Sequence, residues 1–127
     1  MSASEKGDPM ATMSKAASRS FDQPDEQAEK GGVQIDVVYL GDVKVKQATY
    51  PPGWKFSEKM GADRCGDTHV GYMIEGSMHV RLDDGTELAT NPGDVFMVPA
   101  GHDAWTDEGC RLVQFDEFDS AARRFGL

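Results

Sequence analysis

Residues 91–102 constrain the fold more than any other part of the chain, because two turns enclose one short apolar segment. Pro92-Gly93 predict a tight turn, and Pro99-Ala100-Gly101 predict a second one that leads into His102. The apolar run between them, 95–98, has the length of a strand and is too short for a helix. A strand held between two chain reversals is typical of the corner of a β-barrel.

From Val33 onward, short β-rich runs alternate with turns. These runs span 33–40, 43–50, 54–56, 69–75, 78–83, 86–89, 95–98, 102–106 and 111–115. Strands of this length and spacing predict an all-β sandwich or barrel. Gly76, Gly85, Gly93 and Gly101 lie where the pattern must reverse, and we expect positive φ at several of them.

The two ends of the chain differ from this β-rich part. Residues 1–30 are rich in Ser, Ala, Gln and charged side chains and show no periodicity, which predicts a flexible arm. Residues 31–127 are then a single barrel domain. Residues 117–125 predict a short amphipathic helix, because one face carries Phe118, Ala121, Ala122 and Phe125.

Charge and composition exclude several function classes. Thirteen basic residues against twenty-two acidic ones leave a net charge of −9, which argues against nucleic acid as a partner. No apolar run reaches the length of a membrane span, and the first residues lack the apolar core of a secretory signal. We therefore expect a cytoplasmic protein without membrane contact, in which Cys65 and Cys110 are free thiols.

The motifs around the turns resemble the cupin superfamily. In that family the second motif is Gly, five residues, Pro, one residue, Gly, and Gly93, Pro99 and Gly101 match it. Upstream lies the family-like strand 71–76, Gly-Tyr-Met-Ile-Glu-Gly. The resemblance covers about residues 45–115 and implies an antiparallel jelly-roll barrel. Cupins include dioxygenases, isomerases, decarboxylases, sugar-binding regulators and storage proteins, so the fold alone does not name the function.

The family resemblance also assigns positions for metal ligands. Metal-binding cupins carry two histidines one residue apart, a glutamate four residues later, and a histidine three residues after the last glycine of the second motif. Aligned on Tyr72 and Glu75-Gly76, these positions hold Asp63, Cys65, His69 and Ala104. None is the usual ligand, although His102 shares the strand parity of Ala104.

Two interpretations follow from this departure. In the first, Cys65, His69 and His102, with Asp63 as a fourth ligand, hold a divalent transition metal; sulfur and imidazole suit Zn²⁺, and Fe²⁺ less well. In the second, Cys65 is a small buried residue, His69 is a hydrogen-bonded residue of a pocket, and His102 belongs to a turn.

The aromatic side chains predict a cavity for a small molecule. An apolar barrel interior with a few polar groups is the usual composition of such a site. The candidate ligand-binding residues are Trp54, Phe56, His69, Tyr72, Met73, His102 and Trp105. The alternative is that these side chains only fill the core. The expected core residues are Met73, Met78, Val80, Leu82, Phe96 or its neighbours Val95 and Met97, and Leu112 or Val113.

Three function classes remain open from the sequence. The first is a small cupin domain that binds a small organic ligand, and the second is a metal-dependent oxygenase, isomerase or lyase with substituted ligands. The third is an interaction module in which the strand 95–98, apolar on both faces, contributes to a homodimer. The chain has neither the Gly-x-Ser-x-Gly context of a serine hydrolase nor a phosphate-binding glycine loop before a helix.

Overall fold

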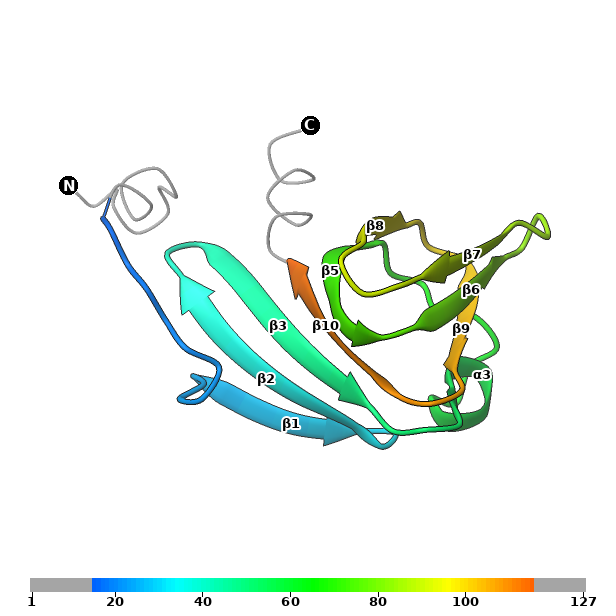
Figure 1. Ribbon diagram of the computed structural model, residues 1–127, viewed down its shortest axis with the longest axis horizontal. Helices are drawn as coiled ribbons and strands as arrows, with labels where there is room; N and C mark the ends of the chain where they lie inside the picture. The colour runs from blue at the N-terminus through cyan, green and yellow to red at the C-terminus, as the bar shows by residue number, and fades with distance from the viewer. Residues whose placement is uncertain (1–14, 116–127) are drawn as a thin grey trace.

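Ten strands form two antiparallel sheets within residues 15–115, the part of the chain that the computed structural model describes. The larger sheet has the order β1-β2-β3-β10-β5-β8, and the smaller sheet has the order β4-β9-β6-β7. In Figure 1, β6, β7 and β9 lie together on the right, and β1, β2 and β3 lie on the left. The all-β, cupin-like jelly roll expected from the sequence is confirmed.

The strands follow the predicted runs closely. Their bounds are β1 Glu26–Lys30, β2 Val33–Leu40, β3 Val43–Tyr50, β4 Trp54–Lys55, β5 His69–Gly76, β6 Met78–Leu82, β7 Glu87–Thr90, β8 Val95–Val98, β9 His102–Thr106 and β10 Cys110–Phe115. The short helix α3 spans Phe56–Lys59. No helix among the described residues is long and apolar enough to cross a membrane.

Strand β1 lies inside the segment that the sequence assigned to a flexible arm. All five of its side chains are exposed, and β1 pairs antiparallel with β2 from Glu26↔Val37 to Lys30↔Val33. A strand without buried side chains shows no alternation of apolar and polar residues, so the sequence pattern does not predict β1. The first half of the predicted arm and the predicted helix at 117–125 fall outside the described residues.

The predicted turn glycines all have positive φ. The values are 75° at Gly76, 92° at Gly85, 93° at Gly93 and 89° at Gly101. Gly76 is also constrained by space, because a Cβ there would lie 2.2 Å from the carbonyl oxygen of Gly109. Only glycine therefore fits this end of β5.

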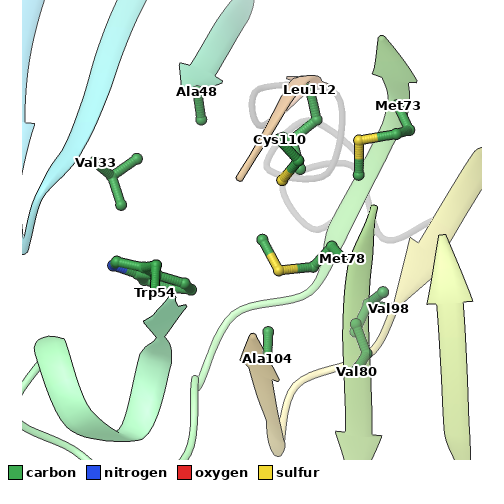
Figure 2. Close-up of a cluster of buried hydrophobic side chains, with 10 residues drawn as sticks. All are labelled: Val33, Ala48, Trp54, Met73, Met78, Val80, Val98, Ala104, Cys110 and Leu112. Atoms are coloured by element: carbon green, nitrogen blue, oxygen red, sulfur yellow. The ribbon is translucent and has the colours of Figure 1, made fainter. Parts of the chain in front are cut away.

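The core lies between the two sheets and is built from side chains of both (Figure 2). Met73 is completely buried, and Met78, Val80 and Leu112 are buried around it, as predicted. Leu82 and Phe96 pack against this cluster while remaining partly exposed. The buried cluster is Val33, Ala48, Trp54, Met73, Met78, Val80, Val98, Ala104, Cys110 and Leu112.

Strand β8 resolves a choice that the sequence left open. Phe96 and Val98 face the interior, whereas Val95 and Met97 are 78% and 60% exposed. Side chains of a strand alternate between faces, so only one of the two apolar pairs can join the core. Of the two alternatives that the sequence left open, the structure supports Phe96, and Val95 and Met97 lie outside the core.

Both cysteines are free and buried, as expected for the thiols, and Cys110 makes the stability depend on pH. Burial raises the pKa of the Cys110 thiol to about 11 from its ordinary value of 9.0, although a hydrogen bond with Thr106 acts in the opposite direction. The folded state holds the thiol proton of Cys110 more tightly than the unfolded state does. The resulting contribution to the free energy of unfolding is fully present below pH 9 and is lost as the pH rises through about 11.

We therefore expect the free energy of unfolding to fall between pH 9 and pH 11, and to fall less steeply in Cys110→Ala. Urea unfolding of both proteins at several pH values in this window measures the difference. Because other groups titrate in both proteins alike, the comparison isolates Cys110. Identical pH profiles for the two proteins would contradict the assignment.

Candidate functional site

A cavity of about 250 Å³ lies between the sheets. Most of its walls are apolar, and the polar side chains that reach it are few. The apolar lining residues include Ile35, Ala48, Tyr50, Trp54, Phe56, Met73, Met78, Phe96, Val98 and Leu112. Apolar walls with a few polar groups are the usual composition of a site for a small molecule.

Three potential metal ligands meet at one wall of this cavity. The donor atoms of Cys65, His69 and His102 all lie within 4.8 Å of one another. The Sγ of Cys65 is 3.4 Å from Nε2 of His69, and the rings of His69 and His102 cross at 74° with their centroids 5.4 Å apart. Three residues spread over 38 positions of sequence thus present sulfur and nitrogen to one point.

The backbone explains how these residues come together. His69 is the first residue of β5 and His102 is the first residue of β9, so both lie where a strand enters the barrel. Cys65 lies in the loop before β5, where its N–H donates to the carbonyl of His102 at 2.8 Å. The N–H of Gly101 donates to the carbonyl of Cys65, also at 2.8 Å. These two bonds fasten the loop to the start of β9.

One hydrogen bond orients the ring of His102. Its Nδ1 lies 2.7 Å from the carbonyl oxygen of Pro99. A carbonyl can only accept, so Nδ1 carries the proton and donates it, which leaves the lone pair on Nε2. A histidine ligand held by a backbone carbonyl in this way is the usual arrangement in metal sites. The turn predicted from Pro99-Ala100-Gly101 thus has a direct role in the site.

The donor set fits a divalent transition metal. Burial raises the pKa of the Cys65 thiol, and a bound cation would favour the thiolate instead. One sulfur and two imidazole nitrogens are ligands that Zn²⁺ commonly takes. Three protein ligands leave one position of a tetrahedral site for water or a ligand, and a metal there would supply Lewis-acid polarisation.

The structure does not place the proposed fourth ligand with the other three. Asp63 is exposed, and it belongs neither to the group of potential ligands nor to the cavity lining. It lies in a loop without strand geometry, where the family's spacing of two residues does not return a side chain to the same face.

Two of the predicted ligand-binding residues lie on outer surfaces. Tyr72 is 43% exposed, because it faces away from the interior that its neighbour Met73 occupies. Trp105 lies on the outer face of the smaller sheet, where its ring stacks on His79 with centroids 5.5 Å apart. The remaining predicted residues line the cavity, namely Trp54, Phe56, His69, Met73 and His102.

Lys46 and Gln114 are among the polar residues of the cavity that were not predicted from the sequence. The alternation of side chains along the strands could have identified both residues. Lys46 has the parity of Ala48 and Tyr50 on β3, and Gln114 has the parity of Leu112 on β10. A charged or amide side chain on the core face of a strand was the available signal.

Comparisons of sequence identify no relative. No protein-family model matches the chain, and no curated protein matches its sequence.

Solved structures, in contrast, match the fold. A cupin superfamily protein from Desulfitobacterium hafniense DCB-2 is 18% identical over 72% of this chain and 82% of that one, with a TM-score of 0.52. An RmlC-like cupin from Shewanella frigidimarina NCIMB 400 is 20% identical, with coverages of 75% and 86% and a TM-score of 0.53. KdgF from Halomonas sp. is 19% identical, with coverages of 71% and 83% and a TM-score of 0.54. At such identities the likeness establishes a shared fold.

Proposed function

We propose that this chain, which has the cupin fold, binds a small organic ligand at a divalent metal ion held by Cys65, His69 and His102. The observation that carries the proposal is the approach of their three donor atoms to within 4.8 Å at the wall of the cavity. The hydrogen bond from His102 to Pro99 supports it, because that bond leaves Nε2 available to a metal.

The cavity walls support a role in ligand binding. Trp54, Phe56 and Met73 supply apolar surface, and the three donors supply the polar end that would orient a ligand. Zinc is the metal that this donor set favours, with iron as the second choice. The alternative within the same site is a metal-dependent oxygenase, isomerase or lyase, which turnover of a bound ligand would reveal.

Metal content tests the proposal. We expect protein purified without a histidine tag and dialysed against buffered Zn²⁺ to retain about one zinc ion per chain by elemental analysis. Protein that retains no transition metal after this treatment would contradict the proposal.

A second proposal concerns assembly, and it rests on strand β8. Among the described strands, β8 pairs with β5 alone, so its other edge is unpaired there. Its exposed residues Val95 and Met97 lie beside the exposed Tyr72 of β5, which pairs with Val95. We propose that a second copy of this chain, related by a two-fold axis, covers this apolar patch. In such a dimer the unpaired edge of β8 would pair antiparallel with the same edge of β8 in the other copy.

We expect a dimer in sedimentation velocity. The dissociation constant of the dimer should be at least ~10-fold higher in Met97→Glu, because the variant buries a charge in the interface. Leu88→Glu is the matched control, since Leu88 is an exposed leucine on β7 of the other sheet. A monomeric wild-type protein, or a Met97→Glu dimer of unchanged strength, would contradict the assignment.

A further inference from the structure

The cavity carries positive charge although the chain as a whole is acidic. The net charge of the chain is −9, yet the charged residues that line the cavity are two lysines, Lys30 and Lys46, and one aspartate, Asp67. Within mostly apolar walls, an ammonium group attracts an anion more strongly than it does in water. The cavity therefore differs in charge from the surface around it.

Lys46 faces the interior from the middle of the larger sheet. Strand register places Lys46 opposite Gln114, and Gln114 opposite Gly71, so the three residues form one row across β3, β10 and β5. Neighbouring strands are about 4.8 Å apart, so the row spans about 10 Å. His69, on the same face of β5, lies two residues from the end of this row. Lys46 thus lines the same cavity as the metal ligands.

The lining of the cavity places Lys46 with the candidate metal ligands. The residues Lys46, Cys65, His69 and His102 all line this one cavity. A positive charge in such a cavity acts on any ligand bound there. Lys46 and the three candidate metal ligands therefore belong to one site.

Gln114 adds a second polar group to the same place. Its side chain lines the cavity and the residue is only 7% exposed. An amide offers two N–H donors, and a lysine offers three. Beyond this pair, the cavity continues over apolar side chains such as Met73, Phe96 and Leu112.

We propose that the ligand is a small organic acid whose carboxylate binds Lys46 and Gln114 while its apolar part fills the rest of the cavity. This inference rests on the proposed function, since it names the ligand class of the same site. A volume of about 250 Å³ lies below the range typical of drug-sized ligands, which favours a small acid. One ammonium and one amide match a single carboxylate, whereas phosphate groups are more often held by arginine forks or several backbone N–H groups.

Titrations with carboxylates and their neutral amides test the proposal. The probes are benzoate and pentanoate, each paired with its neutral amide, followed by NMR chemical shifts in zinc-loaded and metal-free protein. The variant is Lys46→Met, which keeps the length of the side chain without its charge. The control is Lys44→Met, because Lys44 lies on the same strand and is not among the residues that line the cavity.

We expect the wild-type protein and Lys44→Met to bind each carboxylate at least ~10-fold more tightly than its amide. Lys46→Met should lose this preference while its zinc content and its thermal unfolding stay as in the control. A carboxylate preference that persists in Lys46→Met, or that is absent from the wild-type protein, would overturn the proposal. Tighter binding of phenyl phosphate than of benzoate would overturn the choice of a carboxylate.

The metal centre and the anion site can be refuted separately. If metal-free wild-type protein prefers carboxylates through Lys46 and no zinc is taken up, the anion site stands and the metal centre is refuted. If zinc binds to Cys65, His69 and His102 and Lys46→Met changes nothing, the metal centre stands and the anion site is refuted.

Discussion

Replacing Cys65 with alanine is expected to weaken zinc binding by at least ~100-fold, because the change removes the only sulfur among three ligands. The two histidines that remain would still bind zinc, as imidazoles do, but without the thiolate charge that offsets the cation. Competition with a chromophoric chelator measures the affinity in tag-free protein.

Cys110→Ala is the matched control for this experiment. It removes the other buried thiol of the chain, which lies on β10 and outside the group of potential ligands. We expect its zinc affinity to stay within about twofold of the wild-type value. If Cys65→Ala and Cys110→Ala bound zinc equally well, the sulfur of Cys65 would not be a ligand.

Replacing Gly71 with alanine is expected to destabilise the fold by at least ~3 kcal/mol, since there is no room for one more carbon atom. A Cβ at this position would lie 2.1 Å from the carbonyl oxygen of Val113 and 2.7 Å from the ring of Phe96. The first of these neighbours is backbone in the middle of the larger sheet, and it cannot move without disturbing β10.

Gly66→Ala tests whether this effect is specific to position 71. Nothing lies within 4 Å of a Cβ built at Gly66, so we expect a change within about 0.5 kcal/mol. Urea unfolding of both variants measures the difference in the free energy of unfolding. A Gly71→Ala protein within about 1 kcal/mol of the wild type would show that β5 and β10 can separate to admit a methyl group.

The sequence predicted the strands and the turns because their signals are local. Proline and glycine mark the chain reversals, and alternation shows which residues share a face of each strand. Cys65, His69 and His102 could be proposed as neighbours because the resemblance to cupins supplied the long-range register that a single sequence lacks. The structure brings these three together, with donor atoms within 4.8 Å.

Two proposed ligand-binding residues lie outside the cavity because strand parity was not applied to them. Tyr72 and Met73 are neighbours on one strand, so they could not both face the cavity, yet both were proposed to bind the ligand. Trp105 has the parity opposite to that of His102, and the smaller sheet consequently carries it on the outer face. Strand β1 has no buried side chain, so its pairing with β2 left no hydrophobic pattern to find.

Zinc-edge X-ray absorption of tag-free protein measures which atoms surround the metal. We predict one sulfur at about 2.3 Å and two nitrogens at about 2.0 to 2.1 Å, with the sulfur lost in Cys65→Ala. A first shell of nitrogen and oxygen only in the wild-type protein, or a sulfur that persists in Cys65→Ala, would contradict a metal centre built from Cys65, His69 and His102.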